Sequence, residues 1–393
     1  MRNASTIALA AATASAALLA GCANHAPAPE APQPSAQNLQ SAASASSPAQ
    51  PKAAASKWQT EYRGSTDLAK ATVNPEVAKA LGQNKIGGLS GIDRQDGDHY
   101  LVLSDAKGAE DGPVRAFDLN LAQDAQGGTA GAVFNRMIKL TDQAGKPFAD
   151  QTADPESVRT LPEGFMWTSE GNAKEGVAPG IFIADKDGKT TKQFEIPNYH
   201  KPGPNQSYGI RYNKAYEGLA VDKEHKTATV ATEGPLVQDG PAISEKNGGT
   251  VRLTTYDVAS GKAAHEYALP IDAAWEPNTD RGVSEIIDAG DGSLLVLERG
   301  YTKGKGNHAE IYRVKIDGAT DVLGKEALDG KEKPVSKELV FDFANGKGNS
   351  ENVEGMAWGP KHPDGRRTLL VLSDNNFSEK QKSLVHTLAI KEG

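Results

Sequence analysis

The stretch Val353-Glu354-Gly355-Met356-Ala357-Trp358, followed by Leu369-Leu370-Val371-Leu372-Ser373-Asp374, decides how this chain folds. It gives an acidic residue, a short apolar strand, a turn, a second apolar strand and a further acid. Four earlier segment pairs repeat this order. They are Leu89-Ser90-Gly91-Ile92 with Leu101-Val102-Leu103-Ser104-Asp105, Pro155-Glu156-Ser157-Val158 with Met166-Trp167-Thr168-Ser169-Glu170, Tyr216-Glu217-Gly218-Leu219 with Thr229-Val230-Ala231-Thr232-Glu233, and Ser284-Glu285-Ile286-Ile287 with Leu294-Leu295-Val296-Leu297-Glu298.

The spacing of these repeats predicts a β-propeller. The leading positions 90, 156, 217, 285 and 354 lie 66, 61, 68 and 69 residues apart, which is room for four strands and their loops. Hairpin signals at Asp187-Gly188 and Ser260-Gly261 supply the second strand pair of two periods. We therefore expect an all-β propeller of five blades, with six possible if one repeat is degenerate.

The last period contains only three strand-like segments, ending at residues 384–390. A further strand-like segment, Trp58 to Tyr62, lies near the start and has no partner in the repeat scheme. We expect this N-terminal strand to close the ring by pairing with the last blade. A β-sandwich with accidental internal similarity is the alternative fold.

The N-terminus predicts export and lipidation. Arg2 precedes an apolar run from Ile7 to Leu19, and Leu19-Ala20-Gly21-Cys22 resembles a lipobox. This predicts a signal peptide at residues 1–21 and a diacylated Cys22, and the following Ala23 resembles the signal that sorts lipoproteins to the outer membrane, facing the periplasm or the cell surface. Residues 22–56 are mostly Ala, Pro, Ser, Gln and Asn and predict a disordered tether, with the propeller domain at 57–393.

Composition limits the possible chemistry. Cys22 is the single cysteine, so an internal disulfide and a thiol nucleophile are excluded. The formal net charge of −8 becomes −9 once Arg2 leaves with the signal peptide, and this acidity disfavours nucleic acid. The sequence has no Gly-x-Ser-x-Gly elbow, His-Glu-x-x-His pair, Walker loop or dinucleotide fingerprint. We expect a monomer that meets the membrane through its N-terminal lipid alone.

Carboxylates recur at the open end of each repeated hairpin, where an antiparallel turn brings its two ends together. Such a set cannot stay ionised without positive charge, which either nearby arginines (Arg159, Arg281 and Arg299) or a metal ion would supply. An oxygen-only ligand set favours Ca²⁺ over Zn²⁺. The candidate metal ligands are Asp105, Glu156, Glu170, Glu217, Glu233, Glu285, Glu298, Glu354 and Asp374, with Ser90 at the tenth position.

A basic loop follows the fourth repeat and is a candidate substrate contact. It runs from Lys303 through Lys305 to His308, directly after Arg299, and we expect it to overhang the acidic face. The alternative is a solvated loop with incidental lysines.

The repeats together resemble the phytase-like family, whose description refers to esterase-like activity. The segments that carry the resemblance are Gly88-Leu89-Ser90-Gly91, Tyr216-Glu217-Gly218-Leu219-Ala220, Leu297-Glu298-Arg299-Gly300-Tyr301, Asn352-Val353-Glu354-Gly355-Met356-Ala357 and Leu372-Ser373-Asp374-Asn375-Asn376. The resemblance covers almost all of residues 87–390. It implies a propeller and, by analogy with β-propeller phytases, calcium-assisted hydrolysis of phosphate esters.

Three functions follow as hypotheses. In a phosphatase, Glu217, Glu285 and Glu354 are the candidate catalytic carboxylates, and Arg299, Lys303, Lys305 and His308 bind the substrate anion. In a non-catalytic binding propeller, Ca²⁺ only stabilises the blades. In a metal-dependent lactonase or esterase, Asn375 and Asn376 beside Asp374 complete the site of one ion.

Overall fold

The computed structural model describes residues 54–345 and 350–393. The expected signal peptide, Cys22 and nearly all of the expected tether lie outside these residues. Within the described part of the chain, no helix is long and apolar enough to span a membrane.

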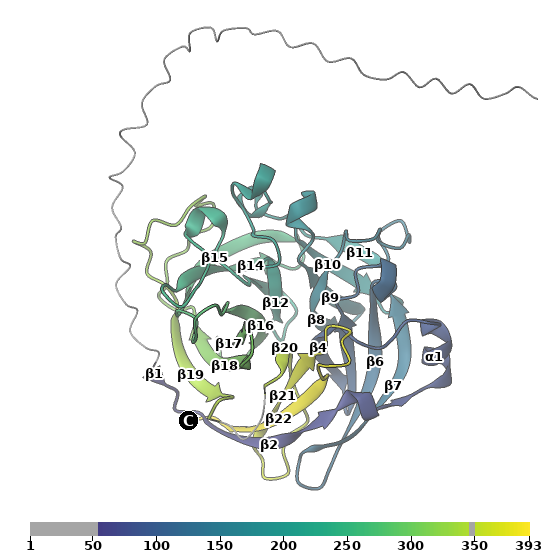
Figure 1. Cartoon of the computed structure of the whole chain (residues 1–393). Coiled ribbons are helices and arrows are strands. Elements are labelled where there is room, and N and C mark those ends of the chain that lie inside the picture. Colours follow the sequence, from purple (N-terminus) through teal and green to yellow (C-terminus); the bar gives the residue numbers. More distant parts are fainter. Residues whose placement is uncertain (1–53, 346–349) are drawn as a thin grey trace, which may run out of the picture. The chain divides into compact units, whose positions relative to one another are not determined.

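Five sheets stand side by side around a centre, one for each sequence repeat (Figure 1). Blade 1 contains β4 (Leu89–Asp96), β5 (His99–Ser104), β6 (Arg115–Gln123), β7 (Thr129–Lys139) and the short β3 (Thr72–Val73). Blade 2 contains β8 (Pro155–Leu161), β9 (Gly164–Ser169), β10 (Gly180–Asp185) and β11 (Thr190–Gln193). Blade 3 contains β12 (Tyr216–Val221), β13 (Thr227–Thr232), β14 (Gly249–Asp257) and β15 (Lys262–Ile271).

The last two blades each recruit a strand from the start of the chain. Blade 4 contains β16 (Gly282–Asp288), β17 (Ser293–Thr302), β18 (Gly306–Lys315), β19 (Ser336–Asp342) and the two-residue β1 (Ala54–Ala55). Blade 5 contains β20 (Asn352–Trp358), β21 (Arg367–Asp374), β22 (Leu384–Lys391) and β2 (Gln59–Asp67). The five-bladed propeller expected from the repeats is confirmed.

Closure of the ring depends on β2. This strand pairs antiparallel with β22 along its whole length, from Gln59 opposite Lys391 to Asp67 opposite Leu384. The innermost strands β4, β8, β12, β16 and β20 contact one another in sequence, and β20 returns to β4. The N-terminal strand therefore closes the ring in the last blade, as predicted.

Helical elements are short and peripheral. The helix α1 (Pro75–Leu81) begins where the Asn74 side chain accepts a hydrogen bond from the Glu76 amide, and it buries Val77 and Leu81 against blade 1. The described part of the chain also contains six 3₁₀ turns in its loops: η1 (Leu68–Lys70), η2 (Ala109–Asp111), η3 (Ala173–Glu175), η4 (Asn198–His200), η5 (Pro204–Gln206) and η6 (Val237–Asp239).

The apolar core is divided among the gaps between blades. Each pair of neighbouring blades encloses one buried cluster, because alternate residues of a strand face opposite sides of its sheet. In blade 4, for example, Leu295 and Leu297 face blade 5, whereas Val296 faces blade 3. Apolar side chains on both faces of each blade thus hold neighbouring blades together. The polar side chains lie instead at the strand ends near the centre.

Candidate functional site

Every innermost strand begins with a β-bulge, and the bulges bring polar residues to equivalent places. The pairing of each innermost strand with the next strand skips one or two residues at this point. A bulge locally re-aims the side chain that it inserts. The residues in the bulges include Ser90, Glu156, Glu217, Ser284 and Glu354.

A second set of equivalent positions lies where the second strand of each blade ends. In each blade, the residue at this strand end pairs through its backbone with the residue two positions before the bulge residue. In blade 2, for example, the Glu170 amide donates a hydrogen bond to the Asp154 carbonyl. The five residues in this set are Asp105, Glu170, Glu233, Arg299 and Asp374, and their partners are Gly88, Asp154, Ala215, Gly282 and Asn352.

Blade 4 differs from the sequence alignment by one residue at both positions. The structure places Ser284, not Glu285, at the bulge, and Arg299, not Glu298, at the strand end. Because side chains alternate between the faces of a strand, a one-residue shift reverses their direction. The expected convergence of carboxylates therefore does not extend to Glu285 and Glu298.

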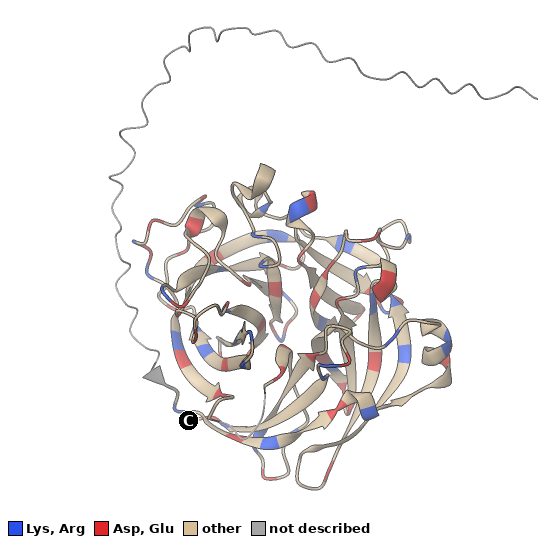
Figure 2. Cartoon of the chain, viewed as in Figure 1, with Lys and Arg blue, Asp and Glu red and all other residues tan. Residues whose placement is uncertain are grey.

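Eight carboxylates do converge at the centre, and we call them the acid ring. Mutual charge repulsion links them through pairs such as Asp105 with Asp374, Glu156 with Glu217, and Glu170 with Asp154. Seven of them are buried, with at most 8% of any residue exposed, and Asp105 is partly buried. The members are Asp105, Asp154, Glu156, Glu170, Glu217, Glu233, Glu354 and Asp374. Acidic residues on inner as well as outer strands are visible in Figure 2.

Among the residues that the structure describes, three cations contact this ring directly. Arg299 lies 3.1 Å from Glu354 and 3.8 Å from Glu233. The Lys214 ammonium is 2.7 Å from the same Glu233, and Lys107 pairs with Asp154. Eight carboxylates against three cations leave an excess of negative charge that these side chains do not neutralise.

The pKa values reflect this excess. Burial, with the charge of Asp154 and Glu233 added, raises the pKa of Glu170 to about 8. Burial and the charge of Glu354 likewise raise the pKa of Asp374 to about 8. The pKa values of Asp105, Glu156 and Glu217 are raised well above normal, by burial first and then by neighbouring carboxylates. Without added positive charge, several members of the ring hold protons at neutral pH.

The ring has the donor set of a cation site. Among the described residues, Asp105 Oδ1, Asp154 Oδ1, Glu233 Oε2 and Asp374 Oδ1 are buried oxygens with no hydrogen-bond partner. Two groups, Asp154 with Glu156 and Glu170, and Glu170 with Glu217 and Glu233, each bring three carboxylate oxygens within 4.8 Å of one another. Hard oxygen ligands of this kind suit Ca²⁺, which takes six to eight of them.

A small cavity reaches the ring from one side. Asp154 and Glu170 form part of its wall, together with Lys107 and the segment Arg211 to Asn213 just before β12. Lys174 lies over the ring of Tyr212, 3.5 Å from its centroid. The approach to the carboxylates is therefore bordered by cationic side chains and one aromatic ring.

Glu285 belongs to a different contact set that crosses the channel between blades. Its carboxylate accepts hydrogen bonds from Ser157 Oγ at 2.8 Å and from the Leu219 amide at 3.1 Å, and it lies 2.9 Å from Arg159. Arg159 also donates to the carbonyls of Ile92 and Ile286. Burial raises the pKa of Glu285 to about 7 against the opposing charge of Arg159. These contacts tie blades 1 to 4 together across the centre.

The remaining predicted residues lie in blade 4. Glu298 pairs with Arg281 at 2.5 Å and with Lys337 at 2.9 Å. Lys303 and Lys305 are exposed at the β17–β18 turn, and Lys305 pairs with Glu276 at 2.7 Å. His308 lies on β18 beside Asp342. Of the four predicted substrate contacts, the structure brings Arg299 to the acid ring.

Sequence reasoning missed three participants. Asp154 lies two residues before Glu156 and faces the ring, whereas Lys107 and Lys214 supply counter-charge from loops next to Asp105 and β12. The sequence could have identified Asp154, because this acid directly precedes Pro155 at the start of the second repeat. The two lysines have no repeated counterpart, so periodicity could not identify them.

The family model described as "Phytase-like: Esterase-like activity of phytase" matches residues 84–377. A curated relative from the fungus Arthroderma benhamiae, named only as an uncharacterized secreted protein, is 23% identical over 202 residues. That match covers 45% of this chain and spans only about two fifths of the relative, 39% of its length.

Solved structures give weak overall likenesses. The catalytic domain of a GH62 α-L-arabinofuranosidase from Coprinopsis cinerea has a TM-score of 0.40 at 10% identity, over 85% of this chain and 97% of that one. A gluconolactonase from Xanthomonas campestris has a TM-score of 0.31 at 11% identity, over 88% of this chain and 99% of that one. Neither likeness carries an argument about chemistry.

Proposed function

This chain belongs to the phytase-like family, and from that premise we propose that it is a calcium-dependent hydrolase of phosphate esters. The observation that supports the proposal is the acid ring, in which eight carboxylates, seven of them buried, face three cations and four of their oxygens have no hydrogen-bond partner among the described residues. A ring of this charge is costly to the fold unless it binds cations.

The residues that would hold calcium are Asp154, Glu156, Glu170, Glu217 and Glu233, which form the two groups with close oxygens. When bound, Ca²⁺ neutralises phosphate oxygens and lowers the pKa of a coordinated water. Glu170 belongs to both groups, so the two groups form one continuous set of ligands. The proposed ligands differ from the nine expected from the sequence in that they include Asp154 and omit five of the nine, namely Asp105, Glu285, Glu298, Glu354 and Asp374.

The protein's own side chains would bind and orient the substrate. Lys107 and Arg211 border the cavity beside Asp154 and Glu170, where a phosphate anion would approach. Arg299 lies deeper, against Glu354 and Glu233. We propose Glu217 and Glu354 as the carboxylates that would accept a proton from the attacking water. Glu285 supports the inner strands through Ser157 and Leu219.

We also propose that the protein is exported and anchored by a lipid on Cys22. The support is the segment Leu19-Ala20-Gly21-Cys22 after an apolar run, together with the word "secreted" in the name of the fungal relative. Ala23 favours the outer membrane as the destination. Fractionation of a Cys22→Ser variant tests this anchor, and unchanged membrane attachment would contradict it.

The hydrolase proposal is tested by turnover of three substrates: para-nitrophenyl phosphate, para-nitrophenyl acetate and a simple lactone. Each is measured with saturating Ca²⁺ and with a chelator. We expect Ca²⁺-dependent turnover of the phosphate ester that Glu217→Gln removes and that the exposed-turn control Asp187→Asn keeps. Turnover of the acetate or the lactone alone would indicate a carboxylic-ester hydrolase. Ca²⁺ binding without any turnover would indicate a binding propeller.

A further inference from the structure

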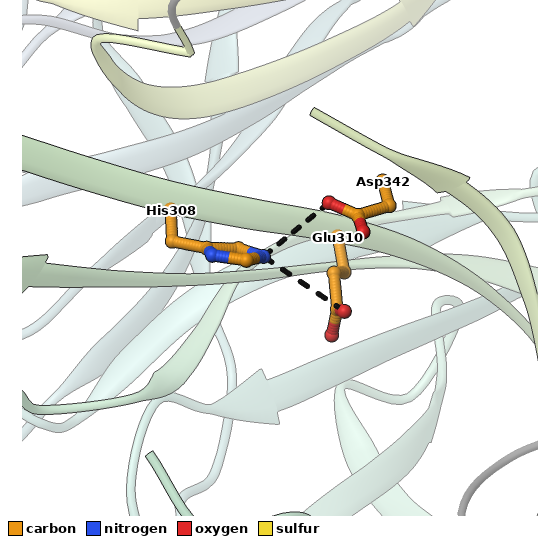
Figure 3. A group of neighbouring side chains, drawn as sticks. All are labelled: His308, Glu310 and Asp342. Atoms are coloured by element: carbon orange, nitrogen blue, oxygen red, sulfur yellow. Dashed lines mark ion pairs between the residues drawn. The ribbon is translucent and has the colours of Figure 1, made fainter. Parts of the chain in front are cut away.

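A second cluster of ligand-type side chains lies on blade 4, separate from the acid ring. His308 and Glu310 stand two residues apart on β18, so they share one face of the sheet. Asp342, at the end of β19, is the backbone partner of Glu310. Figure 3 shows the three side chains turned toward one another.

The spacing of their polar atoms fits a metal ion. His308 Nε2 lies 3.3 Å from Asp342 Oδ1 and 3.9 Å from Glu310 Oε1. Ligands at about 2.0–2.1 Å from a tetrahedral ion lie roughly 3.4 Å apart, so small rotations would complete the geometry. Although both carboxylates are close, His308 Nε2 is buried and makes no hydrogen bond within the described residues.

The surrounding side chains hold the three candidates in place. Glu310 Oε2 accepts hydrogen bonds from Arg281 at 2.8 Å and from Tyr312 Oη at 2.5 Å. The other oxygen, Oε1, remains available to bind a metal ion together with His308 and Asp342. The His308 ring stacks on Trp275, with centroids 4.1 Å apart and planes at 11°. Arg281 covers Trp275. Such outer contacts orient ligands in metal sites.

The local charge also favours a divalent cation. Among the described residues, four carboxylates belong to the connected network and two cations pair with them, which leaves an excess of two negative charges in that set. The carboxylates are Asp272, Glu298, Glu310 and Asp342, and the cations are Arg281 and Lys337. The side chains of His308 and Asp342 are 27% and 15% exposed, although His308 Nε2 itself is buried.

We propose that His308, Glu310 and Asp342 bind one divalent transition-metal ion of the zinc class, with water as the fourth ligand. The imidazole distinguishes this site from the acid ring, whose ligands are oxygens, because nitrogen ligands favour Zn²⁺ or Co²⁺ over Ca²⁺. The proposal does not depend on the hydrolase proposal. It assigns His308 to a metal rather than to substrate.

The test uses the whole mature protein, freed of metal and held in excess Ca²⁺ so that the acid ring does not compete. Calorimetric titration with Zn²⁺ should show one site. Co²⁺, which is paramagnetic, should quench the emission of Trp275, the only tryptophan among four that the described contacts place against His308. Trp275→Phe should remove this quenching and keep the calorimetric site.

His308→Gln and Asp342→Asn should each weaken Zn²⁺ binding by more than about 100-fold, and Tyr312→Phe, which removes an outer contact, by about 10-fold. His265 gives a matched control, because it forms a similar pair with Asp321 at 2.7 Å but has no third ligand among the described residues. His265→Gln and Glu170→Gln should leave the affinity unchanged. Melting curves of the metal-free variants establish that each one folds.

Three results would overturn the proposal. They are the absence of a Zn²⁺ site in the wild-type protein, equal losses in His308→Gln and His265→Gln, or retention of the site in a folded Asp342→Asn variant. Displacement of Zn²⁺ from this site by Ca²⁺ at comparable concentration would also contradict the assignment to the zinc class.

Discussion

The acid ring and a second set of buried charges in blade 3 differ in whether their carboxylates have enough positive partners. In the blade 3 network, made up of His200, Asp239, Arg252 and Glu266, Arg252 contacts both oxygens of Asp239 at 2.7 and 2.8 Å. Its other arm lies 2.6 Å from Glu266, whose second oxygen meets His200 at 2.8 Å. Burial alone would raise the pKa of Glu266, yet His200 and Arg252 lower it below normal.

In the acid ring, burial is equally deep, but the pKa values move upward. Lys107, Lys214 and Arg299 cannot balance eight carboxylates, so Glu170 and Asp374 have pKa values of about 8. The difference teaches that burial of charge is not itself a sign of function. A network with its own counter-charges is structural, and one that lacks them is the candidate for a cation site.

The largest expected effect comes from breaking the balanced network. Arg252→Met leaves Asp239 and Glu266 buried without their main partner and should lower the free energy of unfolding by about 3–5 kcal/mol. Chemical denaturation measures the loss. The same deletion of a partner at an exposed pair, Arg136→Met, should cost less than about 1 kcal/mol. Equal losses of unfolding free energy in both variants would contradict a stabilising role specific to the blade 3 network.

Calcium should stabilise the ring and leave the blade 3 network untouched. A ligand that binds only the folded state at 100 times its Kd adds about 2.7 kcal/mol, so Tm should rise with Ca²⁺ and fall with a chelator. Glu170→Gln removes a carboxylate shared by both candidate groups and should reduce this response. Thr254→Val, beside Glu266, is the buried control and should keep the response. A Tm indifferent to Ca²⁺ would contradict a cation site in the ring.

A smaller effect should appear with pH in the metal-free protein. Because Glu170 and Asp374 have folded pKa values of about 8, above the usual carboxyl range, the folded state holds protons that the unfolded state has already lost. The unfolding free energy should therefore fall as pH rises through 7 to 8. Thermal melts across this window check the sign. Saturating Ca²⁺ should flatten the curve, and a metal-free stability that rises with pH would contradict the cited shifts.

The smallest effect is expected at a surface pair. Asp187 lies at an exposed turn and contacts Arg136 at 2.6 Å. Asp187→Asn should change the unfolding free energy by less than about 0.5 kcal/mol and leave the Ca²⁺ response unchanged. Paired melts with and without Ca²⁺ measure both quantities. A large change here would mean that the Ca²⁺ response reports surface charge in general.

The sequence by itself determined the architecture. The repeat period defined five blades, and the unassigned segment near Trp58 predicted the closing strand, because each blade needs four strands and every apolar face needs a cover. It also located six of the eight carboxylates of the ring at their repeated positions in blades 2, 3 and 5, and a seventh, Asp105, at the strand end of blade 1 whose bulge holds Ser90.

Only the tertiary structure decided the direction of each side chain in blade 4. The sequence pattern aligned Glu285 and Glu298 with the other acids, but the bulge in β16 puts Ser284 and Arg299 in those places. The tertiary structure likewise brought Lys107 to Asp154, Lys214 to Glu233 and Asp342 to His308. The physical reason is that side chains alternate along a strand with a period of two. One inserted residue therefore moves each following side chain to the opposite face of the sheet. The apolar sequence pattern does not reveal this shift, because apolar side chains on either face of a blade pack against a neighbouring blade.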